Sequence, residues 1–156
     1  MTDEFVVREA SPADMPGIGH VRTSVRENLL TVEQLERLGI TPASVAASLL
    51  THRKGWVAER AGQIVAFAMA DRADASIFAL FVLPDYEGRG LGSRLLDLAL
   101  QWLWDNGAEV VWLTTAPETR AARFYARRGW VPVGAEPSGD VRLTYRQTGP
   151  PHGRPG

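Results

Sequence analysis

Three glycines, at positions 88, 90 and 92, stand where a chain could bind a phosphate group. They follow the apolar run 77–83 and Pro84, and they precede a leucine-rich segment. Glycine lets the backbone bend freely and approach a ligand with no Cβ in the way. This order predicts a strand, a loop and a helix, whose first amides point outward where the helix macrodipole places about half a positive charge. We therefore expect an anion site here, and specifically a diphosphate site.

Two other phosphate-binding motifs fit this loop poorly. A nucleoside-triphosphate P-loop carries a lysine and then a serine or threonine after its last glycine, whereas Gly92 is followed by Ser93 and Arg94. A dinucleotide fingerprint has the spacing Gly-x-Gly-x-x-Gly, and the spacing here is Gly-x-Gly-x-Gly. Its acidic partner, about 20 residues further on, would be Glu109, which precedes its strand instead of following it. The P-loop is excluded, and the dinucleotide site is disfavoured.

The elements before the loop predict an antiparallel meander of three strands. Two apolar segments, 56–59 and 63–70, flank the hairpin signal Arg60-Ala61-Gly62. The turn Arg72-Ala73-Asp74 then leads into the strand at 77–83. The glycine loop thus starts at the end of a strand that a hairpin partner supports.

A helix over residues 91–106 is predicted after the loop, with Gly107 as its C-terminal stop. Residues 110–113 form a buried strand, parallel to the strand before the loop because a helix crosses over between them. A shorter helix over 118–128 ends at a glycine, and a closing hairpin joins 131–133 to 141–145. One face of the helix over 91–106 is expected to carry Leu91, Leu95, Leu98 and Trp102.

The first part of the chain predicts one strand and two helices. A strand over 5–8 precedes Ser11-Pro12-Ala13-Asp14, which opens a helix with a serine cap and a proline in its first turn. Helical turns over 32–38 and a helix over 41–50 follow. Residues 1–147 are predicted to form a single domain, and the tail 148–156, which has no apolar residue, is expected to be disordered.

Composition excludes several classes of function. The net charge of −1 and pI of about 6.3 provide no basic field that would favour nucleic acid or an anionic membrane. The chain has no cysteine, which excludes disulfides, cysteine nucleophiles and thiolate metal sites. Its three histidines lack metal-ligand spacing, so we expect no metal. With neither a signal peptide nor a membrane-spanning run in the sequence, a cytoplasmic protein is predicted.

A second motif follows the loop, and together the two resemble a known family. The run Glu87-Gly88-Arg89-Gly90-Leu91-Gly92 resembles the acetyl-CoA loop Gln/Arg-x-x-Gly-x-Gly/Ala of the GCN5-related N-acetyltransferases. The segment from Ala121 to Trp130 resembles the family's second signature, Ala-x-x-Phe-Tyr-x-x-x-Gly-Phe, and the resemblance covers residues 5–145. It implies an α/β (α+β) fold, with a mixed, mostly antiparallel sheet of about six to seven strands, splayed between two central parallel strands and flanked by about four helices.

The resemblance also implies a cosubstrate, acetyl-CoA, held in the cleft between the splayed strands, and an amine acceptor. The backbone amide of Val82 is the candidate donor to the oxyanion. Tyr125 matches the family's general acid, which protonates the leaving sulfur, although a core aromatic is the other interpretation of this residue. The residues expected to contact the cosubstrate are Phe81, Val82, Leu83, Glu87, Gly88, Arg89, Gly90, Leu91, Gly92, Ser93, Phe124 and Tyr125.

Two positions depart from the family's pattern. Glu87 places an acidic side chain beside the diphosphate, where relatives have glutamine or arginine, and is expected to lower affinity while the backbone amides keep the site. Glu118 stands where many relatives have an asparagine that touches the pantetheine arm, so that contact is not carried over.

The sequence leaves the general base and the acceptor open. Asp74, acting through water, is the candidate base, with a plain turn aspartate as the other interpretation and with Asp71, Glu27 and Glu33 as alternatives. Glu27 and Asn28 are expected to contact the acceptor, a primary amine of a small molecule, a peptide or a protein. The alternative function is a non-catalytic acyl-CoA-binding or sensing module. Family members often pair, so a homodimer is also expected.

Overall fold

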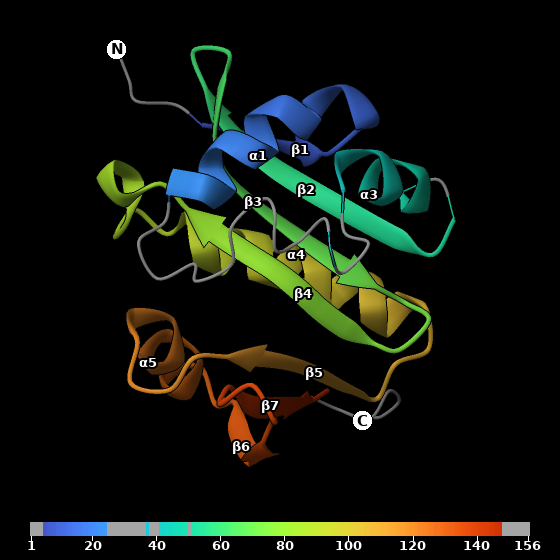
Figure 1. Ribbon diagram of the computed structural model, residues 1–156, viewed down its shortest axis with the longest axis vertical. Coiled ribbons are helices and arrows are strands. Elements are labelled where there is room, and N and C mark those ends of the chain that lie inside the picture. Colours follow the sequence, from blue (N-terminus) through green and yellow to red (C-terminus); the bar gives the residue numbers. More distant parts are fainter. Residues whose placement is uncertain (1–4, 25–36, 38–40, 50, 148–156) are drawn as a thin grey trace, which may run out of the picture.

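A seven-stranded mixed sheet forms the centre of the molecule (Figure 1). The computed structural model describes residues 5–24, 37, 41–49 and 51–147. The sheet has the order β1-β2-β3-β4-β5-β7-β6, and every neighbouring pair is antiparallel except β4 and β5. The predicted mixed, mostly antiparallel sheet is confirmed. Its strands are β1 (Val6–Glu9), β2 (Arg53–Arg60), β3 (Gln63–Asp71), β4 (Ser76–Val82), β5 (Val110–Thr115), β6 (Val131–Ala135) and β7 (Val141–Arg146).

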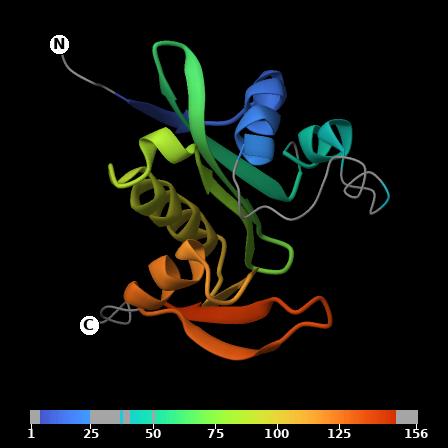
Figure 2. The same ribbon diagram turned by 60° about the vertical axis from the view of Figure 1, so that its left-hand side comes forward.

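Helices cover both faces of this sheet (Figure 2). On one face lie α1 (Met15–Ser24) and α3 (Pro42–Ser48), and on the other lie α4 (Leu91–Asp105) and α5 (Arg120–Arg127). Two 3-10 turns, η1 (Pro12–Asp14) and η2 (Pro84–Tyr86), come before α1 and α4. In the part of the chain that the structure describes, no helix combines the length and the apolar character needed to cross a membrane. The turns predicted over 32–38 and the tail fall outside the described residues.

The core lies on both sides of β3. Every residue of this strand after Gln63 is buried, because α1 packs on one face and α4 on the other. The face predicted for α4 is wrong at Leu98, which is 37% exposed. Trp102 lies at the margin of the apolar stripe, with its ring edge-on to Trp56. The stripe that meets the sheet is centred further round the helix, on Leu91, Leu95, Leu96, Ala99, Leu100 and Leu103.

Residues with positive φ shape two of the connections. Between β2 and β3, Ala61 and Gly62 have φ of 52° and 82°, as a two-residue type I′ hairpin requires. The predicted hairpin is therefore confirmed. The helix predicted from 118 starts at Arg120, because Thr119 is its N-cap and accepts the N–H of Ala122 at 3.1 Å. Glu118, just before the cap, takes a left-handed φ of 63°.

The two parallel strands are joined at one end only. β4 and β5 pair at a single position, Ser76 with Trp112. The backbone N–H of Trp112 donates to the carbonyl of Ala75 at 3.1 Å, and its indole N–H donates to the carbonyl of Asp74 at 2.9 Å. Trp112 therefore fastens β5 to the start of β4.

Beyond this point β4 bends away from β5. Ile77 lies opposite Ala70 and Ala79 lies opposite Met69, which leaves Phe78 as an extra residue in β4. Such a bulge bends its strand and increases the local twist. The predicted splay between the central parallel strands is confirmed, and it opens toward the glycine loop.

Candidate active site

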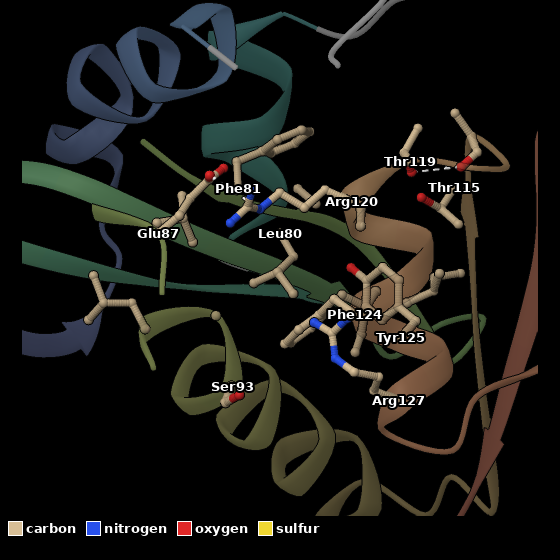
Figure 3. Close-up of a pocket in the computed structure, with 18 of the residues that line it drawn as sticks. Leu80, Phe81, Glu87, Ser93, Thr115, Thr119, Arg120, Phe124, Tyr125 and Arg127 are labelled. Carbon is tan, nitrogen blue, oxygen red and sulfur yellow. Dashed lines mark hydrogen bonds and ion pairs between the residues drawn. The ribbon is translucent and has the colours of Figure 1, made fainter. Parts of the chain in front are cut away.

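The gap between β4 and β5 holds a cavity of about 560 Å³ (Figure 3). Its walls are β4, the loop that leads into α4, the end of β5, and α5. Most of the residues predicted to contact the cosubstrate lie together on these walls. They are Phe81, Val82, Glu87, Gly88, Gly90, Leu91, Gly92, Ser93, Phe124 and Tyr125.

Two residues predicted for this site do not line the cavity. Leu83 is 9% exposed and belongs to the core, and its N–H donates to the carbonyl of Val65 in β3 at 2.9 Å. The guanidinium of Arg89 lies over the ring of Tyr86, 5.5 Å from its centroid. Both side chains therefore support the loop from outside the cavity.

The glycine loop presents the first turn of α4 to the cavity. Gly90 is the N-cap, with a left-handed φ of 83° that a side chain would strain. The first helical hydrogen bond runs from the N–H of Arg94 to the carbonyl of Gly90 at 3.1 Å. The N–H groups of Leu91, Gly92 and Ser93 precede it and have no acceptor within the helix. This is the arrangement in which a helix start binds an anion.

Backbone groups of β4 also face the cavity. Leu83 and Val65 form a hydrogen-bonded pair, and in an antiparallel ladder such pairs alternate with non-bonded ones. Val82 and Leu80 are therefore residues whose N–H and C=O point away from β3, toward β5. The described part of β5 does not pair with them. An extended ligand between the strands can take up these hydrogen bonds.

Tyr125 brings a phenol to this cavity from α5. Its side chain is 6% exposed, with the ring 5.3 Å from Phe124 and 5.6 Å from Trp130. The hydroxyl points into the cavity (Figure 3). Burial raises the pKa of the Tyr125 phenol above its ordinary value, so the group stays protonated at neutral pH. A proton donor thus faces the space between the strands.

Charged side chains line the cavity on the β4 side, on the β5 side and along α5. Arg120 Nε lies 3.3 Å from Glu87 Oε1, and Arg127 lies further along the same helix (Figure 3). Asp140 lines the other side, just before β7 and beside the end of β5, because these two strands pair. The cavity therefore carries a basic helix on one wall, one carboxylate on the β4 side and one on the β5 side.

A sequence model of the acetyltransferase (GNAT) family matches residues 27–130. The chain belongs to this family. The GNAT match includes the glycine loop, both splayed strands and Tyr125.

Curated relatives of this GNAT protein match part of its length. An uncharacterized N-acetyltransferase of Mycobacterium tuberculosis is 38% identical over 73 residues, which are 44% of this chain and 47% of that protein. The [ribosomal protein bS18]-alanine N-acetyltransferase of Haemophilus influenzae is 33% identical over 86 residues, 53% of this chain and 54% of that protein. The chain spans about half the length of the curated relatives it matches.

Solved structures share the fold over nearly the whole chain. The PaiA N-acetyltransferase of Thermoplasma acidophilum, in complex with coenzyme A, has a TM-score of 0.78 at 16% identity and covers 92% of this chain and 99% of its own. The ribosomal-protein-S18-alanine N-acetyltransferase of Escherichia coli has a TM-score of 0.71 at 17% identity, with 94% and 97% covered. At these identities the likeness establishes the GNAT fold alone.

The structure does not bring the predicted base of this GNAT protein into the cavity. Asp74 lies in the turn before β4 and accepts a hydrogen bond from Ser76 Oγ at 2.6 Å. The length of β4, roughly 20 Å, separates it from the glycine loop. Asp71 is bound by Arg53 Nε at 2.9 Å and by the N–H of Ala73 at 2.8 Å. Glu27, Asn28 and Glu33 lie outside the described residues.

Several lining residues were not predicted from the sequence. Arg120 and Arg127 could have been found, because each lies about one helical turn from Phe124, one before it and one after it, on the same face. Asp140 looked like an ordinary turn residue, and only the pairing of β7 with β5 brings it to the cavity. The other unpredicted lining residues include Leu80, Tyr86, Thr115 and Thr119.

Proposed function

We propose that this protein is an N-acetyltransferase that transfers the acetyl group of acetyl-CoA to a primary amine by direct attack. One observation carries the proposal. A single cavity joins the start of α4, the unpaired backbone of β4 and the hydroxyl of Tyr125. These three features match the diphosphate, the amide-containing arm and the reacting thioester of acetyl-CoA in order along one path.

The walls fit this cosubstrate in shape as well as in polarity. The N–H groups of Leu91, Gly92 and Ser93 suit the diphosphate, and the hydroxyl of Ser93 is held by Arg128 at 2.9 Å. A Cβ on Gly92 would make ordinary van der Waals contact with the Phe124 ring at 3.8 Å and with Val82 at 3.9 Å, so this glycine lies against side chains that line the cavity. Leu80 offers its N–H and C=O, and Val82 its C=O, to the amides of the pantetheine arm.

The same residues account for the reaction. Val82 donates its N–H to the carbonyl oxygen on which negative charge develops as the C–N bond forms. Tyr125 gives its phenolic proton to the sulfur as the C–S bond breaks. The raised pKa of Tyr125 does not prevent this transfer, because the same dry surroundings raise the basicity of the thiolate.

Asp140 is the group we assign as general base. An alkylammonium is neutral in only about one molecule in 2,500 at pH 7, so a base that takes its proton speeds attack. Among the described carboxylates, Glu87 and Asp140 line the cavity, and Glu87 is paired with Arg120 at the loop end. Asp140, beside the end of β5, is left to face the acceptor.

The acceptor in this proposal is an amine of a small molecule or of a peptide or protein. The Haemophilus influenzae relative is named for acetylation of an alanine of a ribosomal protein, which supports placing alanine-initiated peptides among the candidates. The cytoplasmic location and the homodimer stay predictions.

Thiol release from acetyl-CoA, measured across a panel of amines and peptides, tests the function. We expect release with at least one acceptor, together with a product whose mass rises by one acetyl group. Coenzyme A binding without thiol release on any acceptor would favour the non-catalytic binding module. Absence of coenzyme A binding would refute the proposal altogether.

A further inference from the structure

A carboxylate stands beside the anion cradle, where its charge opposes a diphosphate. Glu87 directly precedes the glycine loop, and its side chain is 31% exposed and lines the cavity. Its carboxylate is not directed at solvent alone, because Arg120 Nε lies 3.3 Å from Glu87 Oε1. The charge that opposes the ligand is thus already engaged with a cation.

Arg120 is placed unfavourably for its own helix. It is the first residue of α5, where the positive end of the helix macrodipole disfavours a cation. The ion pair reaches from α5 to the loop before α4, across the cavity (Figure 3). It therefore connects the two halves of the splayed sheet on the side where the glycine loop lies.

We propose that Glu87 competes with the diphosphate of coenzyme A for Arg120, and so weakens the binding of both acetyl-CoA and free coenzyme A. Guanidinium groups bind phosphate in a bidentate manner with charge-assisted hydrogen bonds. A diphosphate at the start of α4 can therefore draw Arg120 away from Glu87. The carboxylate is then left beside two like charges, which lowers the affinity.

This competition rests on the proposed function, and it adds a role in product release. Coenzyme A must break the ion pair between Glu87 and Arg120 in order to bind, and the pair forms again when coenzyme A dissociates. The dissociation of coenzyme A is therefore faster. The peptide amides of the loop supply the attraction, and Glu87 sets how tightly the product is held.

Calorimetric titration with coenzyme A tests the inference. Glu87→Gln keeps the size of the side chain and removes the charge, and it should tighten binding by about three- to tenfold. Asp85→Asn is the matched control, because Asp85 is exposed, lies two residues away and does not line the cavity. It makes the same change in net charge and should leave the affinity unchanged.

The Arg120→Gln background separates competition from simple repulsion. There the gain from Glu87→Gln should shrink, because the shared cation is absent. Unchanged or weaker binding by Glu87→Gln, an equal gain from Asp85→Asn, or an undiminished gain in the Arg120→Gln background would each overturn the inference while leaving the proposed function intact. Failure of the unmodified protein to bind coenzyme A would instead remove the proposed function itself.

Discussion

Replacing Tyr125 by phenylalanine isolates the proton that we assign to the leaving thiolate. The variant keeps the ring that packs 5.3 Å from Phe124 and 5.6 Å from Trp130. None of the hydrogen bonds found among the described residues involves the hydroxyl, so the free energy of unfolding should change by less than about 1 kcal/mol. Loss of a general acid should lower kcat by about 10²- to 10⁴-fold, which corresponds to about 2.7 to 5.5 kcal/mol in the barrier.

Three measurements make this prediction decisive. Thiol release gives kcat, calorimetry gives the affinity for coenzyme A, and thermal unfolding reports on the fold. Tyr145→Phe is the control, since Tyr145 stacks on Trp130 at 5.3 Å without lining the cavity. If Tyr125→Phe turned over as fast as the unmodified protein with equal affinity for coenzyme A, Tyr125 would be a core aromatic and the acid role would be refuted.

Three further predictions address the base, the left-handed residue and stability in acid. Asp140→Asn should lower kcat/KM at pH 7 by about 10²-fold, and most of this loss should be recovered as the pH approaches the pKa of the acceptor amine. An unchanged kcat/KM at pH 7 would place the base elsewhere. Glu118→Gly should raise the free energy of unfolding by about 0.5 to 1 kcal/mol in urea titrations, because φ of Glu118 is 63°; the same change at Glu109, where φ is not positive, should destabilise. The guanidinium of Arg8, 2.9 Å from Asp14, holds the pKa of Asp14 at about 2 against an ordinary 3.8. The contribution of ionised Asp14 to the free energy of unfolding is therefore present above about pH 4 and lost as the pH falls toward about 2. Asp14→Asn should therefore cost at most about 2 kcal/mol at pH 7 and only a small fraction of that near pH 2; an equal loss at both pH values would contradict the linkage.

The glycine-loop half of the candidate site could be predicted from the sequence, because glycine at a given position indicates the backbone conformation there. Gly88 and Gly90 have φ of 79° and 83°, so their positions in the sequence reveal the loop before any tertiary contact is known. The crossover helix then fixes β5 as parallel to β4. The position of Tyr125 could also be predicted, because its motif lies within a single helix and the local sequence determines the geometry of that helix.

The part of the candidate site around Asp140 depends on tertiary contacts that no local sequence pattern encodes. Asp140 reaches the cavity only because β7 pairs with β5, and Asp74 misses it because the strands separate at the end opposite to its turn. Periodicity alone also gave the wrong buried face of α4 at Leu98, which is exposed. Apolar residues surround much of this helix, and only its packing against the sheet determines which of them are buried.

The single pairing of Ser76 with Trp112 gives this protein two sheet edges in its interior. Unpaired strand edges usually invite other chains to add to them and are a common route to aggregation. Here both edges face one cavity, with α4 and α5 along its walls. A slender chain can hydrogen-bond there, whereas a further strand with its own side chains would have to displace those helices. The unpaired edges thus stay accessible to a small ligand, while the helices shield them from the strands of other protein molecules.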